Sequence, residues 1–308
     1  MLLFEGTEGF YIEGTAITTG NFDGVHLGHQ FLLKELVKEA KKRSLASVVV
    51  VFYPHPRAVL NGGDSDFRYL NCPSDKNKYF EELGIDAVVR IPFNLDIAAL
   101  SAQDFIQRIL IESLNMKFFL VGYDHRLGNS KFENNILKIA ENKTFEAKEC
   151  EPFTLSIGGV SSSKIRKHLI SGEVNKAATM LGRYYSMRCM VEDGRKLGRS
   201  IGYPTANLKL KDLQCQIPME GVYAVKVKVT EEHFGGMLMI GNRPTLNDGR
   251  GLTMEVYIFD FNRDIYHQQI DVSFVEFVRH NQRFDDIESL KNQLMQDEIV
   301  IRELLNNK

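Results

Sequence analysis

Cysteine is rare in this chain. The four cysteines among its 308 residues are scattered, and no two of them form a C-x-x-C pair. They are Cys72, Cys150, Cys189 and Cys215. This spacing argues against both a zinc site and a disulfide framework, so the reducing cytoplasm is the expected location.

A large excess of one charge and long apolar runs are also missing. The formal net charge is −2, which gives no electrostatic reason to expect a nucleic-acid or membrane partner. No apolar run approaches membrane-spanning length, and residues 1–6 lack the basic and apolar regions of a signal peptide. With 44% hydrophobic and 25% charged residues, the composition is typical of a soluble globular protein.

The hydrophobic pattern of the first half alternates between two kinds of segment. Short apolar runs over 46–52, 87–91 and 118–122 are expected to be strands, and the segments between them include expected helices over 30–42 and 101–113. Alternating strands and helices predict βαβ units around a parallel sheet. Such a fold binds its ligand beyond the carboxyl ends of the strands.

The pattern changes near Leu181. Short β-rich runs separated by Gly, Pro and Asn now predict an antiparallel barrel or sandwich. These runs are 185–191, 221–229, 236–240, 252–259 and 270–278. A final amphipathic helix over 286–305 is expected to cover one side of it. We therefore expect two domains, residues 1–182 and 183–308.

Two histidines flank a glycine where the first strand of the parallel sheet gives way to a helix. The segment from Thr19 to Gln30 reads TGNFDGVHLGHQ. Gly28 lets the backbone come close to a ligand, and a helix N-terminus attracts anions. His26 and His29 can both donate hydrogen bonds to one group. The segment predicts a phosphate site, with two ordinary histidines near a loop as the alternative.

Three further blocks of the first half follow strands or begin a helix. Two prolines stiffen the block Phe52–Arg57 (FYPHPR), whose Arg57 suits a phosphate. The second block is Gly122–Gly128, which contains Asp124 and His125. In the third, Ser162, Ser163 and Arg166 form a hydroxyl-rich helix start with one arginine, a second candidate anion clamp.

The second half contains a long glycine-rich basic loop, residues 194–208, which reads GRKLGRSIGYPTANL. It is not a P-loop, because the pattern G-x-x-x-x-G-K-[ST] is absent from the chain. Gly198 and Gly202 allow backbone N–H groups to surround an anion. Thr205 and Asn207 place two hard oxygen atoms within reach of one Mg²⁺.

Two more segments of the second half carry candidate site residues. Glu255 lies in an otherwise apolar strand, where a solvent-facing position is the ordinary alternative. Arg279, Arg283 and Phe284 lie near the end of the last expected strand, where a solvated helix approach is the alternative.

These motifs, in this order, resemble those of the prokaryotic bifunctional riboflavin kinase/FMN adenylyltransferase family. GNFDGVHLGHQ resembles the H-x-G-H motif of nucleotidyltransferases, SSSKIR their SSTxIR motif, and GRSIGYPTAN the riboflavin kinase motif. The resemblance implies an α/β nucleotidyltransferase domain with a Rossmann-like parallel sheet. It also implies that a small antiparallel Greek-key β-barrel with a C-terminal helix follows this domain. The resemblance further implies two reactions that both use Mg²⁺: riboflavin and ATP give FMN, and FMN and ATP then give FAD and pyrophosphate.

The same resemblance implies roles for individual residues. In the first domain, His26 and His29 would hold the α- and β-phosphates of ATP, while Asn21 and Asp23 shape the nucleotide pocket. Arg57, Ser162, Ser163 and Arg166 would hold pyrophosphate, and Asp124 and His125 would lie near the flavin. In the second domain, Gly198, Gly202, Thr205 and Asn207 would bind ATP, with Thr205 and Asn207 also binding Mg²⁺. Glu255 would act as the base, and Arg279, Arg283 and Phe284 would line the flavin pocket.

Two alternatives stay open. His125 and Leu127 stand where the family usually has aromatic residues, which favours a working kinase fused to an adenylyltransferase of altered or lost flavin specificity. The other alternative is a non-catalytic flavin-binding regulator, which the presence of the motif histidines and Glu255 disfavours. The expected partners are riboflavin, FMN and ATP, without nucleic acid or membrane. The sequence does not determine the oligomeric state, and a weak homo-oligomer is one of the states it allows.

Overall fold

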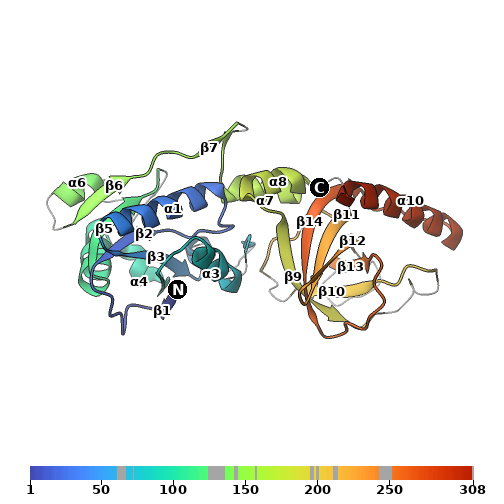
Figure 1. Ribbon diagram of the computed structural model, residues 1–308, viewed down its shortest axis with the longest axis horizontal. Coiled ribbons are helices and arrows are strands. Elements are labelled where there is room, and N and C mark those ends of the chain that lie inside the picture. The colour runs from blue at the N-terminus through green and yellow to red at the C-terminus, as the bar shows by residue number, and fades with distance from the viewer. Residues whose placement is uncertain are drawn as a thin grey trace. The chain divides into compact units, whose positions relative to one another are not determined.

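The computed structural model of the chain describes residues 1–60, 67–71, 73–123, 136–141, 145–156, 158–194, 198, 201–210, 214–242 and 252–306. The chain divides into two compact units, Met1–Ser161 and Ser162–Lys308. Figure 1 shows an α/β unit and a barrel unit, and each is described here by itself.

A six-stranded sheet forms the centre of the first unit. Its strand order is β1-β4-β3-β2-β5-β6, and every neighbouring pair is parallel. The strands are β1 (Leu2–Glu5), β2 (Thr15–Thr19), β3 (Ala46–Tyr53), β4 (Ala87–Pro92), β5 (Met116–Val121) and β6 (Glu146–Glu149). The predicted parallel α/β architecture is confirmed. The sequence order reverses between β2 and β5, so the end of β2 lies where such sheets bind ligands.

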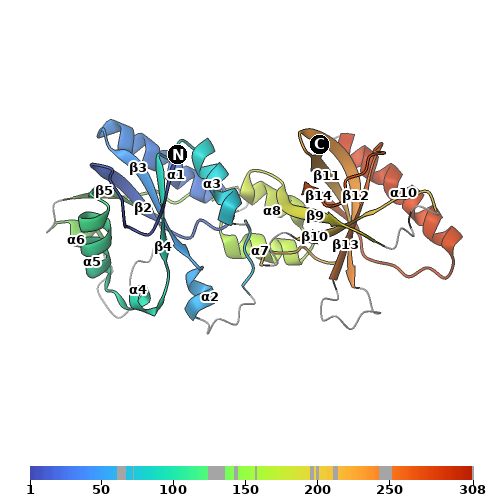
Figure 2. The ribbon, with the colours of Figure 1, turned by 90° about the horizontal axis from the view of Figure 1, so that it is seen from below.

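Apolar side chains on both faces of this sheet bury it between helices. Val48 and Val50 of β3 belong to one core cluster, and Val49 and Val51 to the other, as strand alternation requires. Helices α1 (Leu27–Lys42) and α3 (Pro73–Glu82) pack on one face. Helices η1 (Phe105–Ser113) and α6 (Ile136–Glu141) pack on the other. Figure 2 shows α1 and α3 on one side of the unit and α6 on the opposite side.

Short helices and a two-stranded ribbon complete the first unit. They are α2 (Pro56–Leu60), α4 (Leu95–Ala99), α5 (Ala102–Asp104), β7 (Thr154–Leu155) and β8 (Gly158–Gly159). The expected helix over 101–113 is present as α5 followed by η1, which is a π-helix. Ser101 caps it as expected, because its hydroxyl accepts the N–H of Asp104 at 3.0 Å.

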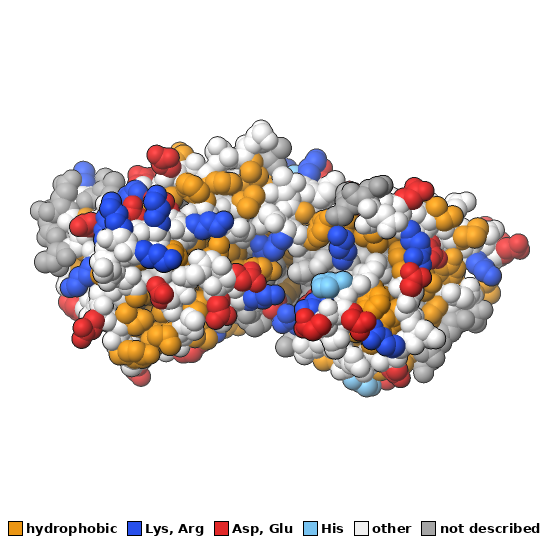
Figure 3. Space-filling model, viewed as in Figure 1, with side chains coloured by type: hydrophobic (Ala, Val, Ile, Leu, Met, Phe, Trp, Pro, Cys, Tyr) orange, Lys and Arg blue, Asp and Glu red, His pale blue; other side chains and the backbone are white. Residues whose placement is uncertain are grey.

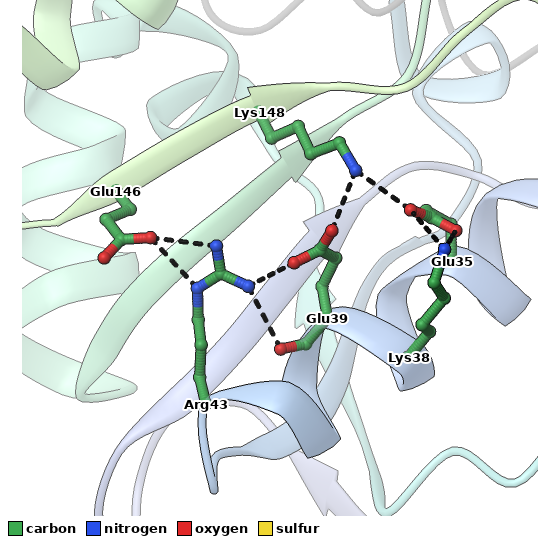
Figure 4. Close-up of polar contacts among 6 residues, drawn as sticks. All are labelled: Glu35, Lys38, Glu39, Arg43, Glu146 and Lys148. Carbon is green, nitrogen blue, oxygen red and sulfur yellow. Dashed lines mark hydrogen bonds and ion pairs between the residues drawn. The ribbon is translucent and has the colours of Figure 1, made fainter.

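A charged network ties the edge strand β6 to helix α1 (Figure 4). The ammonium of Lys148 donates to Glu35 at 2.9 Å and to Glu39 at 2.8 Å. The guanidinium of Arg43 pairs with Glu39 and Glu146, and it lies 4.0 Å from the centroid of the Phe118 ring. Hydrogen bonds from Lys148 and Arg43 lower the pKa of the buried Glu39 carboxyl to about 2.

A closed barrel with the strand order β10-β13-β12-β11-β14-β9 forms the second unit. Its strands are β9 (Tyr185–Glu192), β10 (Ala206–Leu210), β11 (Gly221–Val229), β12 (Glu232–Asn242), β13 (Leu252–Ile258) and β14 (Gln269–Arg279). All neighbouring pairs are antiparallel, so the predicted antiparallel barrel is confirmed. The final helix, α10 (Ile287–Asn306), contacts β11, β12 and β14, as the apolar stripe predicted.

Two helices that precede the barrel in sequence belong to the same compact unit. Helix α7 (Ser162–Ile170) is joined to it through the carbonyl of Leu169, which accepts the N–H of Met219 at 3.0 Å. Helix α8 (Val174–Leu181) contacts β9 and β14 and buries Val174 and Ala177. The first compact unit therefore ends at Ser161, while the predicted domain boundary at residue 182 stays a prediction.

The surface mixes charges of both signs. Figure 3 shows basic and acidic side chains interspersed on the face it presents. Cys150, Cys189 and Cys215 are buried free thiols, while Cys72 lies outside the described residues. Within the described part of the chain, no helix combines the length and the apolar character needed to cross a bilayer.

Candidate functional site

The first histidine of the H-x-G-H segment caps helix α1. Nδ1 of His26 accepts the backbone N–H of His29 at 3.2 Å, and the two rings stack with centroids 3.6 Å apart. Because Nδ1 is an acceptor, the proton of the neutral imidazole lies on Nε2. The helix begins at Leu27, three residues before the expected start at residue 30. A Cβ at Gly28 would lie 3.3 Å from His26 Nδ1, so glycine leaves room for the capping ring.

A strained turn leads from β2 into this helix. Phe22, Gly24 and Val25 have φ values of +47°, +86° and +37°. Positive φ is an outlier for a β-branched residue, and such strain persists only where the surroundings enforce it. The amide of Gln30 contributes by donating to the carbonyl of Val25 at 2.9 Å.

Two side-chain contacts from outside the turn hold it in place. The buried carboxylate of Asp23 accepts the N–H of Leu70 at 2.9 and 3.2 Å. The ammonium of Lys76, on helix α3, donates to the carbonyl of Asn21 at 3.1 Å. The structure thus gives Asp23 an anchoring contact, while its predicted part in shaping the nucleotide pocket stays a prediction.

His29 lies in a desolvated position beside this turn. Its ring contacts Phe22 edge-on, with centroids 5.2 Å apart. Burial lowers the pKa of the His29 imidazole well below its usual value, and electrostatic interactions with His26 and Lys76 lower it further. The ring is therefore neutral at physiological pH and carries one N–H donor.

Several buried polar atoms at this end of β2 have no hydrogen-bond partner within the described residues. They are Thr18 Oγ1, Asn21 Oδ1 and His29 Nδ1. Buried polar groups are almost always satisfied in folded proteins. Their presence at the switch point of the sheet marks a place for a polar ligand.

The second predicted block also lies at a carboxyl end of the sheet, after β3. Arg57 is exposed on the short helix α2, and its backbone N–H donates to Nδ1 of His55 at 3.1 Å. His55 is buried and stacks on Phe67, and its N–H donates to the hydroxyl of Tyr69 at 3.0 Å. This arrangement holds the base of the helix while the guanidinium stays accessible.

The other residues predicted for the first reaction lie outside the described residues or in the second compact unit. Asp124 and His125 lie outside the described residues. Ser162, Ser163 and Arg166 lie in the first turns of α7, as the pattern predicted, but this helix belongs to the second compact unit.

The kinase motif brings its predicted residues together across two barrel strands. The Thr205 hydroxyl donates to the Glu255 carboxylate at 3.1 Å. Asn207 of β10 is the direct cross-strand partner of Glu255 of β13. Glu255 is also half-buried, so it does not lie on a fully solvated face.

Glycines in this loop make room for the motif. A Cβ at Gly194 would lie 1.7 Å from the side-chain nitrogen of Asn207, and one at Gly198 would lie 2.0 Å from the Tyr203 carbonyl oxygen. The Gly198 carbonyl accepts the N–H of Tyr203 at 2.8 Å, which closes a tight turn. Gly202 completes that turn with φ of +89°.

The structure gives Arg279 a partner that the sequence did not reveal. Its guanidinium forms a bidentate pair with the buried carboxylate of Asp297 on α10, at distances of 2.7 to 3.0 Å. Arg279 thus anchors the final helix to β14, and its predicted flavin contact stays a prediction. Arg283 is exposed and Phe284 half-buried on the segment that joins these two elements.

The oxygen atoms around Thr205 suit a hard cation. A hydroxyl, an amide and one carboxylate fit Mg²⁺, which takes its other ligands from water and substrate phosphates. Across the described residues, this site included, no group of three or more His, Cys, Asp or Glu side chains could hold a metal ion.

Comparisons with known proteins identify a family for each half of the chain. A family model described as FAD synthetase matches residues 11–164, and one described as riboflavin kinase matches residues 181–305. The bifunctional riboflavin kinase/FMN adenylyltransferase of Haemophilus influenzae is 36% identical over 290 residues, which cover 93% of this chain and 92% of the relative. The chain belongs to this bifunctional family. The Escherichia coli K12 member is 35% identical, over 94% of this chain and 93% of its own length.

A solved structure gives the same fold under another description. It is a protein of Streptococcus pneumoniae described as a macrolide-efflux protein, which is 30% identical and superposes with a TM-score of 0.89. The match covers 98% of this chain and 99% of the other. The assignment to the riboflavin kinase/FMN adenylyltransferase family rests on the family models and the named relatives.

Sequence reasoning missed Lys76, which contacts the turn before the H-x-G-H segment. A signal for it was present. Lys76 lies three, four and seven positions before Tyr79, Phe80 and Leu83, so it shares the apolar face of its helix. A lysine in that position is expected to have a specific partner.

Proposed function

We propose that the chain carries both reactions of the family, with adenylyl transfer at the H-x-G-H segment and phosphoryl transfer at the barrel. ATP-dependent phosphorylation of riboflavin gives FMN, and adenylylation of FMN by ATP gives FAD and pyrophosphate. The H-x-G-H segment supports adenylyl transfer in the first unit. The contact between Thr205 and Glu255 supports phosphoryl transfer in the second.

For adenylyl transfer, a phosphate oxygen of FMN attacks the α-phosphorus of ATP. The bond between that phosphorus and the bridging oxygen breaks, and pyrophosphate leaves. The Nε2–H of His26 and the single N–H of neutral His29 donate to the phosphates. The protein therefore acts by positioning and electrostatic stabilisation. Arg57 would bind the pyrophosphate in this proposal, and the same role for Ser162, Ser163 and Arg166 stays a prediction from the family resemblance.

For phosphoryl transfer, the carboxylate of Glu255 accepts the proton of the riboflavin 5′-hydroxyl as that oxygen attacks the γ-phosphorus of ATP. The bond between the γ-phosphorus and the bridging oxygen breaks, and ADP leaves. The hydroxyl of Thr205 orients the carboxylate through their hydrogen bond. Thr205 and Asn207 would hold Mg²⁺, which neutralises phosphate charge when it is bound. Arg283 and Phe284 would contact the flavin.

The single observation that carries the kinase proposal is the convergence of Thr205, Asn207 and Glu255 on adjacent strands. A chromatographic product assay with purified protein and Mg·ATP tests both reactions. Riboflavin in one tube should give FMN and then FAD, and FMN in a second tube should give FAD. FMN as the sole product would instead support the alternative of a kinase fused to an altered adenylyltransferase.

The location and partners remain part of the proposal. The scattered cysteines support a cytoplasmic protein whose partners are riboflavin, FMN and ATP. Cell fractionation that placed the protein outside the cytoplasm would contradict this location.

A further inference from the structure

A lysine is buried beside the turn that leads into the H-x-G-H segment. Lys76 is 7% exposed, and its ammonium donates to the carbonyl of Asn21 at 3.1 Å. An ammonium carries three N–H donors, and among the described residues this is the one hydrogen bond of its side chain. Burying a cation is costly unless it is paired or bonded, so this placement needs a reason beyond packing.

The contact falls where the backbone is most strained. The Asn21 carbonyl comes directly before Phe22, the first of the three residues with positive φ. Phe22 packs against both the Phe80 ring and the His29 ring. A shift of the turn would therefore be transmitted to the ring of His29. Lys76 and Phe80 come from the same helix, so α3 holds the turn by a polar and an apolar contact.

Charges from several elements surround His29. His26 on α1 and Lys76 on α3 both disfavour its protonated form. Lys76 itself is attracted by Asp23 in the turn and repelled by Arg90 on β4, and burial lowers the pKa of its ammonium. The cation of Lys76 thus helps to keep the His29 imidazole neutral, with one N–H donor and one acceptor nitrogen.

We propose that Lys76 is a positioning residue for adenylyl transfer, which fixes the Asn21 carbonyl and keeps the strained turn and His29 in their working arrangement. The inference rests on the proposed function of the first unit. The inference adds Lys76, a residue of helix α3, to a site that the sequence motifs define without that helix.

The test compares Lys76→Met, Lys76→Arg and the control Lys78→Met in the full chain. Lys78 lies on the same helix but is exposed, and its ion pair with Glu82 measures 3.8 Å. Lys76→Met should lower kcat for FAD formation from FMN about a hundredfold, because a small misplacement of reacting groups has an effect of that size. FMN formation from riboflavin should stay at the wild-type rate, which shows that the barrel unit is intact, and the circular dichroism spectrum should match that of the wild type, which shows that the first unit is folded. Lys78→Met should leave both rates unchanged.

The pH profile separates positioning from simple structural support. Removing the cation at position 76 raises the pKa of His29, and the proposal holds that the neutral ring is the working form, so the acid limb of the FAD-forming profile should move to higher pH in Lys76→Met. Lys76→Arg keeps the charge and should keep the wild-type limb. Wild-type FAD formation by Lys76→Met would overturn the proposal. A loss without movement of the limb, or equal movement in both variants, would also overturn it.

A second readout does not depend on activity. NMR of histidine-labelled protein, with the His29 signal assigned from a His29→Gln variant, follows the titration of that ring directly. The midpoint should rise in Lys76→Met and stay in Lys76→Arg, and an unchanged midpoint in Lys76→Met would contradict the coupling. If the wild type makes no FAD, the proposed function fails, while this titration still decides whether Lys76 acts on His29.

Discussion

His26 has two roles, which a pair of substitutions can separate. Its Nδ1 caps helix α1, and its Nε2 is left to donate toward a ligand. Asparagine is also a good N-cap, but it does not offer an imidazole N–H at the same place. The pair of variants His26→Asn and His26→Ala therefore distinguishes capping from chemistry.

We expect both variants to lose FAD formation. His26→Ala alone should also lose stability, by about 1 kcal/mol, the usual effect of removing an N-cap. Urea unfolding of the first unit and the FAD assay measure the two effects. Wild-type FAD formation by His26→Asn would contradict the proposed donor, and equal destabilisation of both variants would contradict the capping role.

The limits of sequence reasoning are clear at this scale. The positions of His26, His29, Thr205 and Glu255 near their sites follow from short motifs. The partners of Asp23, Lys76 and Arg279 do not, because Leu70, Asn21 and Asp297 are distant in sequence or bonded through their backbone. Contacts of that kind depend on the fold and leave no local pattern.

At the scale of elements, the network between α1 and β6 predicts a pH-dependent stability. The pKa of Glu39 is depressed to about 2 in the folded protein, whereas an unfolded glutamate titrates near about 4.3. The resulting stabilisation is fully present above the unfolded value and is lost as the pH falls toward the folded value.

Glu39→Gln should therefore lower the Tm of the first unit at pH 7, and its difference from wild type should shrink between about pH 4.3 and pH 2. Circular dichroism melts across this range measure it. Glu82→Gln is the matched control, because Glu82 is exposed in a 3.8 Å pair. A difference from wild type that stayed constant with pH would contradict the proposed ionic contribution.

The packing of α7 and α8 predicts where the chain can be divided. These helices bury apolar residues in the barrel unit: Ile165, Leu169, Val174, Ala177, Met180 and Leu181. A fragment of residues 162–308 should accordingly melt at a higher temperature than one of residues 183–308, which exposes the surface that these side chains cover. Equal melting temperatures would instead favour the predicted boundary at residue 182.

Most elements could be predicted from hydrophobic period alone. Strands β3, β4 and β5 were visible as apolar runs and α10 as an apolar stripe, whereas β1 and β6 were not predicted. Strand β10 was hidden, because its residues 206–210 overlap the glycine-rich motif and look like loop. The π-helical form of η1 was not visible either, since its apolar pattern resembles that of an α-helix.

At the scale of the whole molecule, two compact units with separate cores predict two activities that fail separately. His29→Ala should abolish FAD formation while FMN formation from riboflavin continues. Glu255→Gln should greatly reduce FMN formation while FAD formation from added FMN continues. Product chromatography with each substrate measures both, and parallel loss of the two activities in either variant would contradict the division of labour.

The two units also differ in what their sheet edges expose. The barrel is closed, so its strands pair on both sides, whereas the open sheet ends in β1 and β6. Strand β6 carries charged side chains, but β1 presents Leu2 and Leu3, which are 44% and 45% exposed. An apolar edge of this kind is a template for intermolecular strand pairing. We therefore expect Leu3→Lys to raise the concentration that the protein reaches before it aggregates.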